Sequence, residues 1–287
     1  MGTIVVGVAG TAELDHGLVW ALQRASVTGD TVDAVHAWEP IAYGADPASG
    51  LLALAPDALE SAARDRLEKA VATAVARSGS DVAVRSRLEC GGAAGILERC
   101  SRTADLVVVT ARPMTLAGRF VHGSVASALL HHAACPVVVV PVDASRHGAD
   151  PERILVGADF APASQHALDW AAEEAARNEA PLIPAFVRPP LGEPLAGATT
   201  AEDLDRDIEL RLRARTPAGK DVQPRVLVGS PGEELVELAH REDLLVVGSR
   251  GRSGLAGWLL GSTSSYVVRH APCPVVVVRE HPQPTHA

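Results

Sequence analysis

Residues 248–262 read GSRGRSGLAGWLLGS, a glycine-rich stretch that closes on a small hydroxyl residue. Its pattern is G-x2-G-x9-G-S, formed by Gly248, Gly251, Gly261 and Ser262. Glycine lets backbone N–H groups approach anionic oxygens, because no Cβ stands in the way. A helix that begins at Gly261 and Ser262 would direct its free N–H donors and the positive end of its dipole at a phosphate. Arg250 adds positive charge, so the stretch indicates phosphate binding.

The stretch matches neither of two familiar phosphate-binding loops. A P-loop needs GxxxxGK[ST], because its lysine reaches the terminal phosphates, and the chain has no such sequence. The dinucleotide pattern GxGxxG is absent after the first strand. An alternative interpretation is a flexible connection in which Ser262 only caps the following helix. The glycines alone leave both interpretations open.

The chain repeats itself. TIVVGVAG (3–10) returns as RILVGADF (153–160), and HAACPVVVVP (132–141) returns as HAPCPVVVVR (270–279). A repeat of this length that is present twice implies two similar domains rather than a solenoid. We place these domains at 1–141 and 152–280. The polar segment 142–151 between them carries Gly and Pro and is expected to be the linker.

Strand-like and helix-like patterns alternate within each copy. In the second copy we expect strands at 154–158, 182–187, 222–228, 243–248 and 274–279, and helices at 163–177, 201–215, 231–240 and 264–270. Short continuous apolar runs that alternate with helices predict a parallel sheet covered on both faces. The aliphatic composition, with only 3% aromatic residues, favours the same α/β fold class.

These features together resemble the universal stress proteins, in the tandem form of high-GC bacteria. The family's ATP-binding pattern is G-x2-G-x9-G-[ST], and the ending RHAPCPVVVV (269–278) and the opening ILVGAD (154–159) are also typical of it. The resemblance implies two open, doubly wound, Rossmann-like sheets of five parallel strands, each in the order 3-2-1-4-5. Ligands of such a sheet bind at the carboxyl ends of strands one and four, where the order reverses.

The resemblance also implies a site in the second copy. Relatives place an aspartate, here Asp159, by the nucleoside, the backbone at Val187 against adenine, and the glycine loop around the phosphates. An Asp after a strand is otherwise an ordinary turn residue. The implied site residues are Gly157, Asp159, Val187, Gly248, Arg250, Gly251, Gly261, Ser262, Thr263 and Ser264. The ligand implied is ATP, with Mg²⁺ held mainly by phosphate oxygens and water.

The first copy departs from the pattern at the same points. Ala9 stands where the second copy has Asp159, while Thr110 and Pro113 stand in place of two glycines. Proline has no N–H to donate, and both side chains add bulk where phosphates would need bare backbone. We therefore expect a degenerate first site that holds no ATP.

Composition excludes several other classes. The net charge is −9 with no block of Lys or Arg, which argues against nucleic-acid binding. No apolar run approaches the roughly 18–20 residues that span a bilayer, and the N-terminus lacks the basic region of a signal peptide. Four scattered cysteines indicate reduced thiols in a cytoplasmic protein. His132/Cys135 and His270/Cys273 share the spacing H-x2-C, but we expect no metal site there.

The function expected is an ATP-binding sensor or regulator of the stress response, with a protein partner that the sequence does not identify. No general base stands near the glycine loop, so we assign no catalytic residue. A slow ATPase or phosphate-transfer enzyme, and a scaffold with an empty pocket, remain the alternatives. The apolar strands 136–140 and 274–278 are unprotected edges, and in relatives this edge makes a two-fold dimer. We expect them to pair inside one chain and leave a homodimer open.

Overall fold

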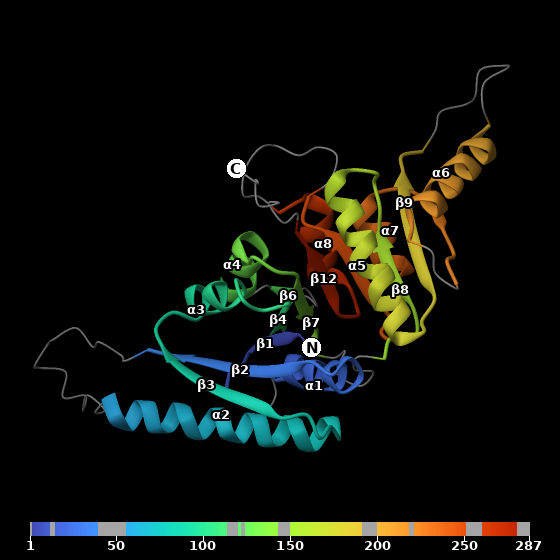
Figure 1. The fold of residues 1–287 in the computed structure, drawn as a ribbon. Coiled ribbons are helices and arrows are strands. Elements are labelled where there is room, and N and C mark those ends of the chain that lie inside the picture. The colour runs from blue at the N-terminus through green and yellow to red at the C-terminus, as the bar shows by residue number, and fades with distance from the viewer. Residues whose placement is uncertain are drawn as a thin grey trace, which may run out of the picture.

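The computed structural model describes most of the chain, namely residues 2–11, 15–39, 56–113, 120–121, 124–142, 150–190, 200–217, 221–250 and 260–279. Gly251, most of the expected linker and the last residues of the sequence lie outside this set. Figure 1 shows the two halves of the chain side by side, the first in blue to green and the second in yellow to red.

The first half contains strands and helices in alternation. Its elements are β1 (Thr3–Gly7), α1 (His16–Thr28), β2 (Thr31–Trp38), α2 (Pro56–Ser78), β3 (Val84–Cys90), α3 (Ala93–Cys100), β4 (Leu106–Thr110), β5 (Arg112–Pro113), β6 (Phe120–Val121), α4 (Ser124–His132) and β7 (Val137–Val140). The short strands β5 and β6 pair with each other outside the main sheet. They follow β4, where the second half has its glycine-rich stretch.

The second half repeats the order. Its elements are β8 (Ile154–Gly157), α5 (Pro162–Asn178), β9 (Leu182–Arg188), α6 (Ala201–Arg215), β10 (Arg225–Val228), α7 (Pro231–Leu238), β11 (Leu244–Gly248), α8 (Ser262–His270) and β12 (Val275–Val278). Every expected element is present. The third strand begins three residues late, and Val222 makes only an isolated bridge to Leu182. Pro224 explains the delay, because it cannot donate a ladder hydrogen bond.

All ten long strands form one sheet, in the order β10-β9-β8-β11-β12-β7-β4-β1-β2-β3. Within each half the strands are parallel and follow the order 3-2-1-4-5, which confirms the predicted fold class. The two edge strands β7 and β12 pair with each other in the antiparallel direction. The expected pairing inside one chain is therefore present, and it joins the halves into a continuous sheet.

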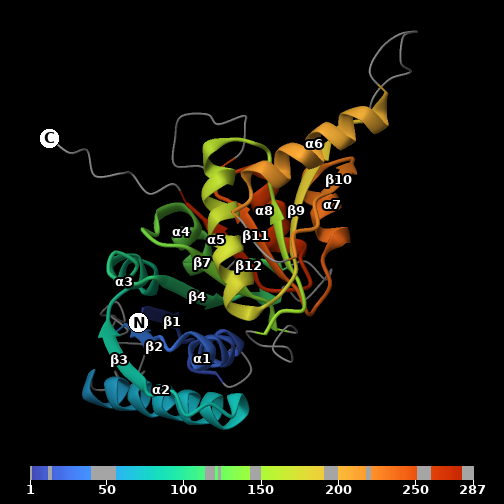
Figure 2. The ribbon, with the colours of Figure 1, turned by 45° about the vertical axis from the view of Figure 1, so that its right-hand side comes forward.

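Two hydrophobic cores cover the two faces of this sheet, and both cross the junction between the halves. Val138 and Val140 of β7 contribute to the core under α1, α2 and α5. Val137 and Val139 point to the opposite face, in the core under α3, α4, α7 and α8. Because successive side chains of a strand alternate between faces, strands buried on both faces read as unbroken valine runs. Helix α6 lies apart, beside β9 and β10 at the far edge (Figure 2).

Candidate site at the reversal of strand order

The carboxyl ends of β8 and β11 lie side by side where the strand order reverses in the second half. Leu155 pairs with Leu245 and Val156 with Val246, in parallel register. The chain leaves β8 toward α5 on one face, and it leaves β11 toward α8 on the other. The two connections diverge and open a crevice at this end of the sheet.

A cavity of about 130 Å³ occupies the crevice. Its lining residues are Gly157, Ala158, Asp159, Ser164, Ala185, Val187, Pro231, Leu235, Val247, Gly248, Arg250, Gly261, Ser262, Thr263 and Ser264. Nine of the ten residues expected from the sequence are in this set, and the tenth, Gly251, lies outside the described residues. The volume is below the roughly 300–1,000 Å³ of typical ligand pockets.

Hydrogen bonds fasten together the two ends of the glycine-rich segment. Ser264 Oγ donates to the Gly248 carbonyl oxygen at 2.6 Å, in a buried position. The Gly261 N–H donates to the Ser249 carbonyl oxygen at 2.9 Å. The start of α8 is thereby held against the end of β11. These two hydrogen bonds tie Gly261 and Ser264 to the residues that end β11 and follow it.

The glycines of the site are required for different reasons. A Cβ on Gly248 would lie 2.9 Å from the carbonyl oxygen of Ala163, and one on Gly157 would lie 2.9 Å from Leu235 Cδ1. These two glycines allow close packing within the protein. Among the described residues, the atom nearest to a Cβ on Gly261 would be the Ser249 carbonyl oxygen at 3.5 Å, and the backbone angles of Gly261 (φ −61°, ψ 153°) suit any residue. Packing against the described residues therefore does not require glycine at position 261.

The first turn of α8 faces the cavity without a side-chain cap. Gly261 is the N-cap residue, it makes no side-chain cap bond, and Ser262 is already the first helical residue. The alternative interpretation, in which Ser262 caps the helix, is therefore wrong. Backbone N–H groups at the start of a helix lack partners within the helix, and they carry its positive partial charge. This end of the cavity favours an anion.

Asp159 provides the carboxylate of the cavity lining. Its Oδ1 accepts a hydrogen bond from the Ala161 N–H at 3.0 Å, and its own N–H donates to Ser164 Oγ at 3.3 Å. The first of these contacts is an Asx turn, so the aspartate does shape the turn after β8. The side chain remains partly exposed at the cavity wall.

Arg250 lies at the anion-favouring end, and a second arginine, Arg279, lies close enough to interact with it. Arg250 follows β11 and lines the cavity, and Arg279 follows β12 on the neighbouring strand. The Nη1 atom of Arg279 is buried and makes no hydrogen bond within the described chain. Burial, together with the positive charge of Arg250, lowers the pKa of Arg279. Two neighbouring cations, one of them desolvated, reinforce the preference for an anion.

Sequence reasoning missed one wall of the cavity. Pro231 and Leu235 of α7 line it, together with Ser164 of α5. The reversal of strand order points to the segments after β8 and β11, but not to a helix that packs across the same crevice. The signal that was available is the glycine at position 157. A glycine at the end of an apolar strand indicates close approach by another group, here Leu235.

The first half has a matching cavity of about 400 Å³, lined among others by Ala9, His36 and Thr110. The bulk expected at Thr110 does not close it. The Thr110 hydroxyl instead accepts a hydrogen bond from the Gly17 N–H at 2.9 Å. No carboxylate is among the lining residues, and Ala126 replaces Ser264. Exclusion of ATP from this half would therefore depend on lost polar groups rather than lost space.

Other expected features give little chemistry. The described residues contain no group of three or more His, Cys, Asp or Glu side chains that could hold a metal ion. The four cysteines are free, and burial raises the pKa of the Cys135 thiol to about 12 and that of Cys273 still further. Within the part of the chain that the structure describes, no helix is long and apolar enough to cross a membrane.

The sheet topology and the crevice place the chain among the doubly wound α/β proteins, which bind ligands where the strand order reverses. Comparison with known proteins narrows this class. The model of the universal stress protein family matches the chain twice, over residues 1–141 and 151–279. The chain therefore belongs to the universal stress protein family, with two tandem copies of the family's unit.

Relatives match over nearly the whole chain. A universal stress protein of Mycolicibacterium smegmatis is 33% identical, over 96% of each chain. One from Mycobacterium tuberculosis (strain H37Rv) is 30% identical, over 96% of this chain and 97% of its own. The crystal structure of a universal stress protein from Archaeoglobus fulgidus covers 96% of this chain and 98% of its own, with a TM-score of 0.68 at 19% identity. At that identity the similarity establishes the fold alone.

Proposed function

We propose that the second half of this protein, residues 152–280, binds one ATP, and that the first half, residues 1–141, is a structural partner without ATP. The protein would act as a cytoplasmic sensor or regulator of the stress response, whose state depends on the bound nucleotide. One observation carries the proposal. Nine of the ten site residues expected from the sequence, from separate segments of the chain, line one cavity at the reversal of strand order.

The chemistry of the cavity supports a nucleotide. The uncapped start of α8 and Arg250 would bind phosphate oxygens. Asp159 would accept hydrogen bonds from the nucleoside, and the backbone near Val187 would lie against the base. Gly261 supports the same placement, because no contact with the described residues requires glycine there. Close approach of a ligand's phosphates to the backbone would explain it.

Magnesium would accompany the triphosphate and neutralise part of its charge. The lining residues contribute one carboxylate, Asp159, which already accepts a hydrogen bond from Ala161. Mg²⁺ prefers oxygen ligands and keeps several waters. The phosphate oxygens and water would therefore hold the ion, with no cage of protein ligands.

Binding without rapid hydrolysis is the expected behaviour. The lining of the cavity contains no histidine, lysine or glutamate that could serve as a general base. A slow ATPase or phosphate-transfer enzyme is the alternative. Release of ADP from bound, radiolabelled ATP faster than hydrolysis in solution would favour that alternative.

Calorimetry with ATP, ADP, AMP, cyclic AMP and adenosine, in the presence of Mg²⁺, tests the proposal. We expect ATP to bind most tightly and Asp159→Asn to weaken it by about 10–100-fold, since hydrogen bonds to charged groups contribute about 1.5–3 kcal/mol. Asn retains an oxygen that can accept from Ala161, so the turn is preserved. Wild-type protein that binds none of these compounds would support the scaffold with an empty pocket.

A further inference from the structure

The two edge strands that join the halves have the same sequence, so strand pairing alone does not determine which strands pair. Strands β7 and β12 both read VVVV, and Val138 pairs directly with Val276. These two valines occupy equivalent positions in the repeat, because HAACPVVVVP aligns with HAPCPVVVVR. A residue that meets its own equivalent lies on a two-fold axis. As far as the strands are concerned, β7 could pair equally well with β7 of a second chain.

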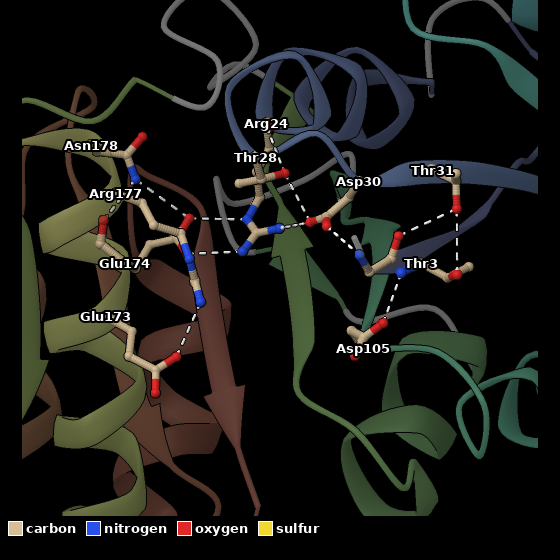
Figure 3. A network of polar contacts seen from close by, with 11 residues as sticks. Thr3, Arg24, Thr28, Asp30, Thr31, Asp105, Glu173, Glu174, Arg177 and Asn178 are labelled. Atoms are coloured by element: carbon tan, nitrogen blue, oxygen red, sulfur yellow. Dashed lines mark hydrogen bonds and ion pairs between the residues drawn. The ribbon is translucent and has the colours of Figure 1, made fainter.

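A second pair of equivalent residues also meets on this axis, but these two residues carry opposite charges. Arg24 of α1 and Glu174 of α5 are also equivalent positions, 150 residues apart like Trp20 and Trp170. Arg24 Nε donates to Glu174 Oε1 at 2.9 Å, and Arg24 Nη2 donates to Glu174 Oε2 at 2.8 Å. Their side chains are only 7% and 2% exposed. Figure 3 shows the two side chains meeting between α1 and α5.

Local partners hold both side chains in place. Arg24 Nη1 also contacts Asp30 at 3.1 Å, and Glu174 also accepts from Arg177 Nη1 at 3.1 Å and from the Asn178 side chain at 3.5 Å (Figure 3). These groups belong to the same half as the residue they contact. The Nε and Nη2 edge of Arg24 is therefore paired by the opposite half, through a bidentate contact that suits arginine and carboxylate.

We propose that the Arg24–Glu174 pair determines which halves associate: a first half docks on a second half, and not on another copy of itself. Two first halves joined through β7 would bring Arg24 against Arg24, and two second halves would bring Glu174 against Glu174. In each case two like charges would face each other in a buried position, and each would keep only its local partner, Asp30 or Arg177, in place of the opposite charge across the axis. The repulsion of wrong partners supplies the selectivity that identical valine edges lack.

Buried ion pairs of this kind are often replaced by apolar residues without loss of stability. A purely structural role and a selective role therefore predict different results for Arg24→Met/Glu174→Met. Removing both charges should leave the fold as stable as before, but it should relax the choice of partner. The reversed pair Arg24→Glu/Glu174→Arg, made together with Asp30→Asn and Arg177→Gln so that neither new charge meets a like charge within its own half, should retain the choice, because it again places opposite charges on the axis.

A cysteine at position 138 reports the choice directly. In the correct pairing, Val138→Cys faces Val276 and finds no thiol. When two first halves pair through β7, two such cysteines meet on the axis, at a separation that a disulfide can bridge. The full-length chain carries this change together with Cys90→Ser, which removes the exposed native thiol. Protein is refolded from denaturant, oxidised and separated on a non-reducing gel, with thermal unfolding as the check on folding.

With the native ion pair and with the reversed pair, we expect monomeric chains. With the Met pair, we expect the disulfide-linked dimer to increase at least several-fold. Val138→Cys/Val276→Cys, with the native ion pair, is the positive control and should form its disulfide within one chain. The proposal is overturned if the Met pair gives no more linked dimer than the native pair, or if the native pair already gives it. If the Met pair fails to fold, linked dimer in the reversed pair overturns the proposal, and its absence there supports it.

Discussion

The hydroxyl of Ser264 donates a hydrogen bond to the carbonyl oxygen of Gly248 at 2.6 Å, across 16 positions of the sequence. This contact links the first turn of α8 to the end of β11, and with it the two described ends of the glycine-rich segment. The first half has Ala126 at the position of Ser264 and therefore lacks the bond. Ser264 is therefore a site residue whose structural role can be tested without any ligand.

Ser264→Ala should lower the free energy of unfolding by about 1–3 kcal/mol, because it leaves a buried carbonyl oxygen without its partner. Urea unfolding measures the loss. Ser262→Ala is the matched control. Ser262 is exposed and lies two residues away on the same helix, so its removal should change stability by no more than about 0.5 kcal/mol. Equal effects of the two variants would show that the bond to Gly248 contributes nothing.

Gly261→Val should weaken ATP binding by about tenfold or more, which corresponds to about 1.4 kcal/mol, with little change in thermal stability. The side chain fits the protein, whose nearest atom would lie 3.5 Å from the new Cβ, but it would stand where phosphates approach the backbone. Gly95→Val, at an exposed position of α3 with no atom within 4 Å, is the control. Unchanged affinity in Gly261→Val would remove this end of the motif from the site.

Gly248 and Gly261 show how far the sequence determines the site. The repeated strands predicted the fold class, and the family resemblance, which the glycine spacing carries, implied the reversal of strand order and the segments that meet there. The sequence did not reveal that Gly248 serves packing against Ala163 while Gly261 is sterically free, since both read as G. That difference depends on which backbone approaches each Cα, and only the assembled helices and strands determine it.

The contact between the halves shows a second limit. The valine runs predicted that β7 and β12 would pair, because an exposed apolar edge strand has unpaired backbone groups that can hydrogen-bond to another strand. Nothing in the sequence indicated that Arg24 meets Glu174. Single charges on helices are usually solvated, and the two residues are 150 positions apart. Their meeting follows from the two-fold relation of the halves, which the strand pairing establishes.

Val138→Asp should destabilise the protein by about 3–5 kcal/mol or more, because it places an uncompensated charge in a position with 0% exposure at the junction of the halves. Val276→Asp, on the opposing strand, should have a similar effect. The control is Val27→Asp, at a position that is 55% exposed and should tolerate the charge. The shift of the urea midpoint of each variant relative to wild type measures the loss of stability. Tolerance of both buried substitutions would mean that the halves are held together elsewhere.

Asp15 should make stability depend on pH. Burial raises the pKa of this carboxyl to about 6 from its ordinary value of 3.8, and the Ala9 N–H, His36, Arg77 and the Gly10 N–H only partly offset the effect. Neither carboxylate oxygen makes a well-formed hydrogen bond to the described residues. The folded protein thus binds the proton more tightly than the unfolded chain does, and stability contributed by the neutral form is lost as the pH rises.

The melting temperatures of wild type and Asp15→Asn, measured from below pH 4 to above pH 6, test this prediction. Wild type should lose stability relative to Asp15→Asn as the pH rises from about 4 to about 6, and the difference should level off above that. If the melting temperature of wild type instead rises relative to that of Asp15→Asn as the pH rises, the folded protein stabilises the carboxylate, which contradicts the prediction.

The stoichiometry of ATP binding tests the central claim most directly. Protein freed of endogenous ligand by unfolding and refolding is titrated with ATP and Mg²⁺ in a calorimeter, beside Asp159→Ala. We predict one ATP per chain in wild type and none in Asp159→Ala. Two ATP per chain would show that the first half binds nucleotide despite Ala9 and Ala126. One ATP that persists in Asp159→Ala, or none in wild type, would contradict the assignment of the site to the second half.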